Sequence, residues 1–492
     1  MEVRVRYAPS PTGLQHIGGV RTALFNYLFA RSQGGKFILR LEDTDRSRSS
    51  EVFTRNLYNT FAWLGIHWDE GPDTGGPAAP YVQSERFSLY RKHAEELLAQ
   101  DNAYYCFCAP ERLDQIRAER EASHSPETGY DRHCRSIPRE EAARRAASGE
   151  PCTIRLKIPL GERTVFRDQL LGDIEWKNDD VNPDPVLLKS DGFPTYHLAN
   201  VVDDHLMGTS HVLRAQEWLP STPLHVILYR AFGWEHPEYC HLPMVMGQDG
   251  KKLSKRHGAT SVDEFRRQGY LKEALINYVA LLGCSYEEGK DLYTLEELAE
   301  RFSLDKLNKA PAIFDYKKLE WYNGLYIRMK TNEELAALAL PYAVEQGLFG
   351  YVMREPSGEQ RELFKSAMVL VKERALFLKD IPGKLRYIFT EPVVPAASEF
   401  IPKKSTLPAA RELLTMGREL TTPITEAETT EAAEAAVKAF AEQKGLKLGD
   451  LLMPLRVAIT GERVSPPLFG SIRLLGAARS LARIDRALVV LA

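Results

Sequence analysis

Residues 3–45 read VRVRYAPSPTGLQHIGGVRTALFNYLFARSQGGKFILRLEDTD, and this stretch decides the fold class. Apolar and polar side chains alternate over residues 3–7, which is the pattern of a β-strand, and the prolines and glycine of residues 9–13 interrupt it. Apolar residues then recur at helical spacing over residues 20–31, where two glycines end the run. Residues 37–41 follow as a short apolar run typical of a buried strand. The stretch therefore predicts a strand–helix–strand unit.

Three acidic residues, Glu42, Asp43 and Asp45, close this unit. If its two strands are parallel, the connection is right-handed, and the first loop, the start of the helix and Glu42 meet at one edge of the sheet. Ligands of open α/β sheets bind at this carboxyl edge. From these residues alone, a tight turn beside solvated acids is the alternative interpretation.

The composition is that of an ordinary globular protein. At about 150 residues per domain, 492 residues predict roughly three domains. Hydrophobic residues make up 44% and charged residues 27%, which excludes disordered and collagen-like classes. The net charge of −3 means that a nucleic-acid partner would have to be met by a local basic patch. Six cysteines are too few for a disulfide framework, and no signal-peptide or membrane-spanning pattern is found, so we expect a cytoplasmic protein.

The character of the sequence changes along the chain. A stretch rich in proline and glycine interrupts the α/β pattern, a basic loop follows at residues 248–256, and helical patterns dominate after Asp263. The helices predicted from periodicity include residues 110–122, 271–282, 295–302, 333–346, 359–379 and 429–444.

Two segments have the chemistry to bind phosphate. His16-Ile-Gly-Gly19 lies where the first helix begins, and a helix N-terminus offers unpaired N–H groups and partial positive charge to an anion. It matches neither the P-loop nor the dinucleotide fingerprint. Lys252 and Lys255, in Lys252-Leu-Ser-Lys-Arg256, could neutralise charge that builds up during transfer at phosphorus. A basic loop alone is most often simply solvated, so the pairing of the two segments carries the argument.

Four motifs, taken together, resemble those of one family. They are RYAPSPTG at 6–13, HIGG at 16–19, LEDTD at 41–45 and KLSKR at 252–256. The set is similar to the class I aminoacyl-tRNA synthetases in the form carried by bacterial glutamyl-tRNA synthetases, and residues 190–204, 211–214 and 454–461 fit the same pattern. The resemblance implies an α/β Rossmann-like catalytic domain with an inserted α+β acceptor-binding domain, followed by an all-α anticodon-binding half.

The resemblance also implies a division of the chain. The expected parts are the two halves of the catalytic domain at 1–95 and 189–247, an inserted acceptor-stem-binding domain at 96–188, a stem-contact region with the KLSKR loop at 248–315, and a helical anticodon-binding region at 316–492.

The implied reaction is activation of L-glutamate by ATP to glutamyl-adenylate, with Mg²⁺ accompanying ATP, and transfer to the terminal adenosine of tRNA(Glu). The catalytic residues would be His16, Lys252 and Lys255, and Gly18 and Gly19 would join them in binding ATP. The glutamate-binding positions of the family correspond to Arg6, Ala8, Ser10, Glu42, Tyr196, Asn200 and Arg214. Gln216 stands where the family usually has an acid. We expect a monomer that does not bind membranes.

The tRNA specificity leaves alternatives open. Arg374 falls at an anticodon-reading position where arginine is associated with members that charge only tRNA(Glu). A non-discriminating form would also glutamylate tRNA(Gln). A catalytically inactive tRNA-binding protein is the alternative from another class, and the presence of His16, Lys252 and Lys255 argues against it.

Three cysteines of the predicted insertion, Cys106, Cys108 and Cys134, resemble the zinc knuckle of some family members, since three thiolates suit Zn²⁺. Ser136 stands where a zinc-binding relative has histidine. The candidates for a fourth ligand are Tyr130, His133 and His124. The alternative is a group of unmetallated thiols packed in the insertion.

Overall fold

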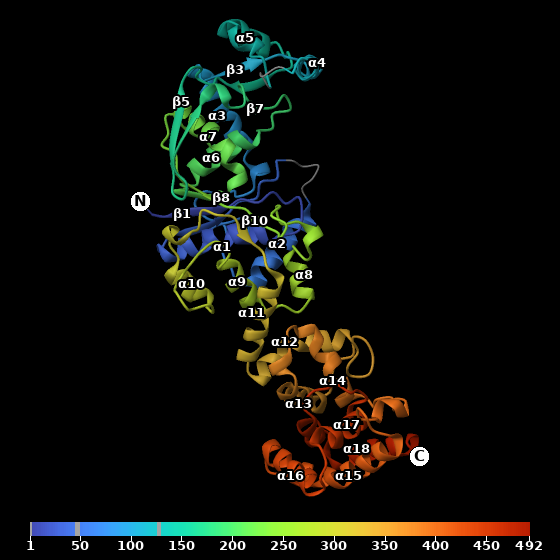
Figure 1. The fold of residues 1–492 in the computed structure, drawn as a ribbon. Coiled ribbons are helices and arrows are strands. Elements are labelled where there is room, and N and C mark those ends of the chain that lie inside the picture. The colour runs from blue at the N-terminus through green and yellow to red at the C-terminus, as the bar shows by residue number, and fades with distance from the viewer. Residues whose placement is uncertain (1, 45–49, 125–128) are drawn as a thin grey trace. The chain divides into compact units, whose positions relative to one another are not determined.

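The computed structural model describes residues 2–44, 50–124 and 129–492 (Figure 1). The chain forms two compact units, which are treated separately below. The N-terminal unit comprises Met1–Phe265 and Leu275–Asp315, and the C-terminal unit comprises Arg266–Ala274 and Tyr316–Ala492.

The strands, all before residue 314 in the described chain, are β1 (Arg4–Tyr7), β2 (Lys36–Leu39), β3 (Ala103–Cys106), β4 (Thr153–Leu156), β5 (Arg163–Asp168), β6 (Gly172–Lys177), β7 (Val186–Leu188), β8 (His211–Ala215), β9 (Glu238–Leu242), β10 (Val245–Met246) and β11 (Ala312–Ile313). The helices up to the same point are α1 (Ile17–Ser32), α2 (Glu51–Leu64), α3 (Phe87–Ala99), α4 (Pro110–Ala122), α5 (Arg139–Ala147), α6 (Tyr196–Leu206), α7 (Thr222–Phe232), α8 (Val262–Arg267), α9 (Lys272–Ala280) and α10 (Leu295–Arg301).

The strand–helix–strand unit predicted from the first stretch is confirmed. Strands β1 and β2 pair in parallel, with Arg4 opposite Lys36. Helix α1 begins after His16, whose Nδ1 accepts the Gly19 N–H at 3.2 Å and so caps the helix. Glycine is required at position 19, because a Cβ there would lie 2.7 Å from the hydroxyl oxygen of Tyr7. The loop and the helix N-terminus therefore meet at the carboxyl end of β1.

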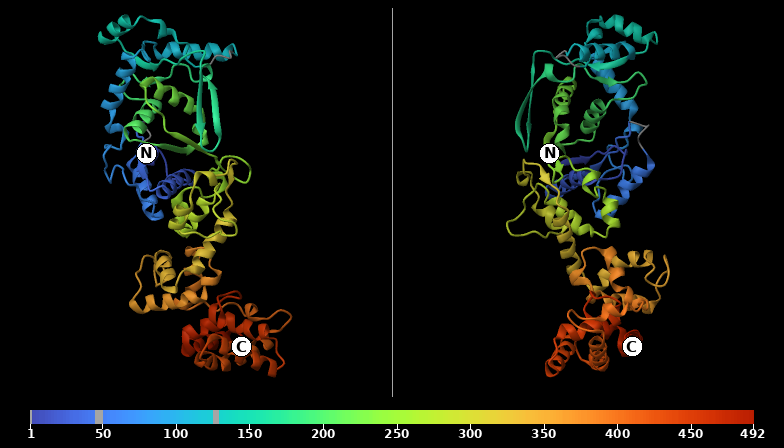
Figure 2. Two further views of the ribbon diagram at one scale, coloured as in Figure 1. Left: turned by 90° about the vertical axis from the view of Figure 1, so that its left-hand side faces the viewer. Right: turned by 45° about the vertical axis from the view of Figure 1, so that its right-hand side comes forward.

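A second parallel pair extends this arrangement. Strands β8 and β9 are parallel, and Ser210, just before β8, accepts a hydrogen bond from the Arg4 N–H at 2.8 Å, which places β8 beside β1. The long hairpin β5–β6, from the predicted insertion, joins the edge of β9 where Asp168 lies opposite Tyr239 (Figure 2). The rest of the insertion contains the antiparallel sheet β3–β4–β7. The insertion thus contributes a strand to the sheet that holds Arg214.

The C-terminal unit contains helices and no strand among its described residues (Figure 1). They are α11 (Tyr316–Met329), α12 (Asn332–Glu345), α13 (Gly358–Ala367), α14 (Ile381–Phe389), α15 (Leu407–Glu426), α16 (Thr430–Gln443), α17 (Leu448–Thr460) and α18 (Leu468–Val490). Thr331 and Ser357 begin α12 and α13 with capping boxes, which satisfy backbone N–H groups that a helix start leaves unpaired. No helix in the described part of the chain has the length and apolar content needed to cross a membrane.

The single helix predicted over 359–379 is wrong. Helix α13 ends at Ala367, and three 3₁₀ turns follow, at Met368–Leu370, Lys372–Arg374 and Leu378–Asp380. Apolar residues in this stretch are spread over more than one helical face, and the tighter turns bury Met368, Leu370 and Val371. The interruption places Arg374 in a turn rather than on a helix face.

Candidate active site

The first segment predicted to bind phosphate, at the start of α1, pairs through its backbone with the residues that follow the second. The Ile17 N–H donates to the Thr260 carbonyl at 3.0 Å, and the Val262 N–H donates to the Gln15 carbonyl at 3.1 Å. His16 and Ser261 form an antiparallel bridge between these two bonds. The basic loop at 248–256 therefore returns directly to the N-terminus of α1.

Lys252 lies near His16 and pairs with Glu217. Partial desolvation and the nearby Lys252 ammonium group lower the pKa of His16. The ring is therefore neutral at pH 7, and its capped Nδ1 leaves Nε2 as the N–H donor. Gln216 and Glu217 are adjacent in a 3₁₀ turn, so an acid is present one position beyond Gln216. The backbone of Lys255 lies in the turn Lys255–His257, and its side chain lies outside the described part of the structure.

A buried network of ion pairs surrounds Arg6 and Glu42. Arg6 donates from Nε and Nη2 to Asp204, at 3.0 and 3.2 Å. Arg40 donates to the same carboxylate at 2.6 Å and to Glu42 at 3.1 Å. Burial raises the pKa of Glu42 against the opposing charges of Arg40 and Arg6. Burial also disfavours the charge on Asp204, but the two arginines outweigh it and lower the pKa of Asp204.

Arg214 differs from these arginines because all its polar partners are neutral. It is 5% exposed, and its Nε donates to Nε2 of His241 at 3.1 Å. Its Nη2 donates to the Thr222 hydroxyl at 2.7 Å, whereas Nη1 reaches the Tyr196 hydroxyl at a longer 3.3 Å. No ion pair to Arg214 is found among residues 2–44, 50–124 and 129–492. A buried cation without an anion is costly, so the site favours a ligand that brings a carboxylate.

The remaining predicted glutamate-binding residues lie around the same centre. Tyr196 and Asn200 lie one turn apart on α6 and therefore on one face. Burial raises the pKa of Tyr196, and the charges of Arg214, Glu42 and Arg6 also act on it, so these groups lie within electrostatic reach of its hydroxyl. Ala8 is half-buried and Ser10 is exposed in the loop after β1. The loop is joined to Glu42, whose N–H donates to the Pro9 carbonyl at 3.1 Å.

Two residues linked to Arg214 by hydrogen bonds, His241 and Asp168, were not predicted from the sequence. Asp168 ends β5 and His241 lies in β9, and Asp168 accepts the His241 backbone N–H at 3.0 Å and contacts ring Nδ1 at 2.7 Å. Both are buried. They are 73 residues apart in the chain, so no local sequence pattern contains both of them.

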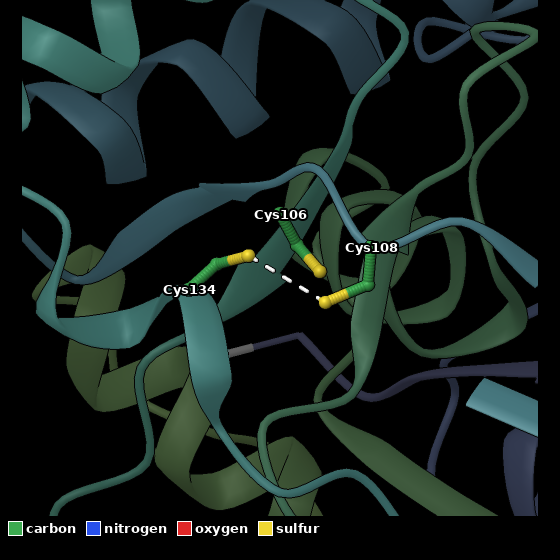
Figure 3. A group of neighbouring side chains, drawn as sticks. All are labelled: Cys106, Cys108 and Cys134. Atoms are coloured by element: carbon green, nitrogen blue, oxygen red, sulfur yellow. Dashed lines mark hydrogen bonds between the residues drawn. The ribbon is translucent and has the colours of Figure 1, made fainter. Parts of the chain in front are cut away.

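The three cysteines of the insertion form one cluster, the only group in the described chain whose sulfur, imidazole and carboxylate atoms could hold a metal together. Their Sγ atoms lie within 4.8 Å of one another and turn inward (Figure 3). The Tyr130 hydroxyl lies 3.3 Å from Cys106 Sγ and 3.7 Å from Cys108 Sγ. Burial raises the pKa of Cys108 to about 12. Burial also acts to raise the pKa of Cys106, but its hydrogen bonding with Tyr130 and with the backbone of Cys108 outweighs burial and lowers that pKa. Neither His124 nor His133 belongs to the cluster.

Arg374 lies on a pocket of the C-terminal unit. The pocket has a volume of about 500 Å³, and its lining includes Arg374, Tyr387, Thr460 and Ser465. It is lined by residues from the 3₁₀ turns, α14 and the end of α17. The interrupted helix thus supplies Arg374 to a concave surface.

Comparison with known families agrees with this geometry. Residues 2–321 match the family described as tRNA synthetases class I (E and Q), catalytic domain, and residues 334–488 match the anticodon binding domain. Over 99% of each chain, the sequence is 57% identical to the glutamate–tRNA ligase of Treponema denticola. It is 47% identical to the glutamate–tRNA ligase of Thermus thermophilus, with 99% of this chain and 100% of the relative covered.

Solved structures give the same result. The crystal structure of a glutamate tRNA ligase from Elizabethkingia meningosepticum, in complex with its amino acid, superposes with a TM-score of 0.88 at 38% identity. The match covers 100% of both chains. The likeness therefore extends over both units.

Proposed function

Because the chain belongs to the glutamate–tRNA ligase family of class I synthetases, we propose that it activates L-glutamate with ATP and transfers the glutamyl group to the 3′-terminal adenosine of tRNA(Glu). One observation carries the choice of amino acid. Arg214 is a buried cation whose partners are neutral, within reach of Tyr196 and close to Glu42 and Arg6. A carboxylate side chain would neutralise it, whereas the neutral amide of glutamine would leave the cation unpaired.

The chemistry needs no protein nucleophile. The α-carboxylate of glutamate attacks the α-phosphorus of ATP, which releases pyrophosphate, and the tRNA hydroxyl then displaces AMP from the adenylate. His16, Gly18 and Gly19 lie at the N-terminus of α1, whose partial positive charge would attract the phosphates, and Lys252 and Lys255 would stabilise the charge that develops there. Mg²⁺ enters with ATP, held chiefly by the phosphate oxygens. Glu42 would lie near the substrate ammonium group, and Ala8, Ser10 and Asn200 would complete the glutamate site.

The rest of the proposal concerns tRNA. Residues 1–95 and 189–247 would form the catalytic domain, 96–188 would bind the acceptor stem, and 248–315 would contact the stem beyond it. Residues 316–492 would bind the anticodon, which the family match over 334–488 supports. The pocket beside Arg374 offers a guanidinium to a base edge, where arginine forms bidentate hydrogen bonds. We propose that the enzyme is monomeric, works in the cytoplasm and discriminates against tRNA(Gln).

The decisive test is aminoacylation with labelled L-glutamate, run in parallel on purified tRNA(Glu) and tRNA(Gln) with ATP and Mg²⁺. We expect charging of tRNA(Glu) alone, and we expect Arg374→Gln to raise the relative charging of tRNA(Gln). Charging of both tRNAs by the unaltered protein would establish the non-discriminating form and contradict the role of Arg374. Charging of neither would refute the proposed function.

We also propose that the cysteine cluster binds zinc. The three sulfur atoms are close enough to share one ion, and the Tyr130 hydroxyl lies beside two of them. Zinc there would hold the insertion together, since structural zinc sites stabilise small folds directly. Elemental analysis of the purified protein should find about one equivalent of zinc per chain, lost in Cys108→Ser and retained in the control Cys152→Ser, at a cysteine that does not belong to the cluster.

Tyr130→Phe decides the fourth ligand. Loss of zinc in this variant would identify the phenol oxygen as a ligand, and full retention would remove it from the set. A metal-free native protein would show that the cluster is a group of packed thiols.

A further inference from the structure

The side of Arg214 that faces away from Tyr196 is held by a chain of three buried groups. Nε of Arg214 lies 3.1 Å from Nε2 of His241, and Nδ1 of His241 lies 2.7 Å from Asp168. Thr222 adds a hydroxyl that accepts from Nη2 of Arg214 at 2.7 Å and lies 3.0 Å from Nε2 of His241. His241 and Thr222 are both 0% exposed and Asp168 is 1% exposed, so water does not compete for these bonds.

Hydrogen bonds determine which nitrogen of His241 carries the proton. Four N–H groups point at the Asp168 carboxylate, from the backbones of Leu170, Leu171 and His241 and from the His241 ring, at 2.9, 2.8, 3.0 and 2.7 Å. These bonds outweigh burial and lower the pKa of Asp168, so the carboxylate stays ionised and accepts from Nδ1. Burial lowers the pKa of His241, so its ring is neutral and Nε2 carries a lone pair.

That lone pair is what the Arg214 Nε–H requires. In the opposite tautomer, the Nε2–H of His241 would face the Nε–H of Arg214. The two donors would repel each other and displace the guanidinium. The bonds on this side, at 2.7 and 3.1 Å, are shorter than the 3.3 Å contact from Nη1 to Tyr196. The bonds to Nε and Nη2 therefore hold the guanidinium so that Nη1 lies beside the Tyr196 hydroxyl.

We propose that Asp168 and His241 are positioning residues that hold Arg214 for the side-chain carboxylate of glutamate, and so set the selectivity for glutamate over glutamine. This inference rests on the proposed function. His241 lies on β9, beside the β8 strand that holds Arg214, and Asp168 lies on β5, the next strand of the sheet. The pair acts on Arg214 through hydrogen bonds. A carboxylate–imidazole pair serves the same purpose behind metal ligands, where it fixes tautomer and orientation.

Two substitutions of His241 separate positioning from simple packing. His241→Leu fills the space but offers Arg214 no acceptor, whereas His241→Gln can place its amide oxygen near the position of Nε2. In aminoacylation of tRNA(Glu), we expect His241→Leu to raise KM for glutamate about tenfold or more, as loss of a hydrogen bond to a charged group predicts. KM for ATP and for tRNA should stay within about twofold of the unaltered enzyme, and His241→Gln should recover most of the glutamate affinity.

Asp168→Asn gives a second test that keeps the ring in place. All four contacts of Asp168 require an acceptor, so the NH₂ group of asparagine must face at least one N–H donor. If that NH₂ group faces Nδ1 of His241, the ring proton moves to Nε2. We expect a rise in KM for glutamate and weaker discrimination against glutamine in this variant too.

Unchanged KM for glutamate in a folded His241→Leu protein would overturn the proposal, as would a fall in kcat of equal size for both substitutions with KM unaltered. If His241→Leu does not fold, unchanged KM and unchanged discrimination in Asp168→Asn would overturn it instead. These outcomes require an active parent enzyme. Absence of glutamylation by the unaltered protein would instead refute the proposed function.

Discussion

Replacement of Arg214 by methionine should lower kcat/KM for L-glutamate by about a thousandfold, or about 4 kcal/mol. The substitution removes the protein's partner in the buried, hydrogen-bonded charge pair that Arg214 would form with the side-chain carboxylate of the substrate. Methionine retains the apolar stem, so the loss reports the guanidinium. The kcat/KM of Arg214→Lys should lie between those of the parent and Arg214→Met, since an ammonium group keeps the charge but not the planar set of donors. Steady-state aminoacylation at varied glutamate measures the effect, and KM for ATP provides the internal reference.

The same change at Arg6 is the matched comparison. Arg6 is paired with Asp204, so Arg6→Met leaves that buried carboxylate with Arg40 alone and should destabilise the folded protein by about 3 kcal/mol. Arg214→Met removes a cation that has no anionic partner among the described residues, and its thermal unfolding temperature should equal or exceed that of the parent. Equal destabilisation by the two substitutions would contradict the distinction drawn between these arginines.

Lys255→Ala should slow adenylate formation by about a hundredfold to a thousandfold while tRNA binding is retained, because a charge aimed at a developing negative charge acts mainly on the transition state. ATP–pyrophosphate exchange in the presence of tRNA(Glu) measures the first effect, and a tRNA-binding titration measures the second. Lys252→Ala is the control within the same loop. Lys252 is already paired with Glu217, so we expect its loss to cost less. Parental exchange rates in Lys255→Ala would remove this lysine from the mechanism.

The parts of the fold that follow from local pattern were predictable. The helix at Pro110–Ala122 coincides with its sequence prediction, and α10 begins at Leu295, where the helix predicted over 295–302 begins. The strand–helix–strand unit was predicted, whereas the parallel pairing of β1 with β2 entered the sequence analysis only as a condition, which the structure fulfils. The prediction of one helix over 359–379 failed because the apolar residues there do not all lie on one helix face. Helical periodicity assumes a single buried face.

The candidate site likewise contains residues that could be predicted from the sequence and contacts that could not. Motif residues such as His16 and Glu42 were predictable, since they lie in the loops at the end of each strand. The pairing of Arg6 with Asp204 joins residues 198 positions apart, and the contact of His241 with Asp168 spans 73. Those contacts depend on which strands and helices pack together, so no sequence window contains them.

The bridge between His16 and Ser261 has a consequence for synthesis on the ribosome. The N-terminus of α1 is completed by Thr260 and Val262, which are made some 245 residues after Ile17. At about 5 to 20 residues per second, these partners arrive roughly 12 to 50 s after the helix has been translated. During that interval the Ile17 N–H at the start of α1 lacks the Thr260 carbonyl that it pairs with in the folded protein. A translational pause placed before residue 260 would lengthen this exposure, whereas one placed after residue 262 would not.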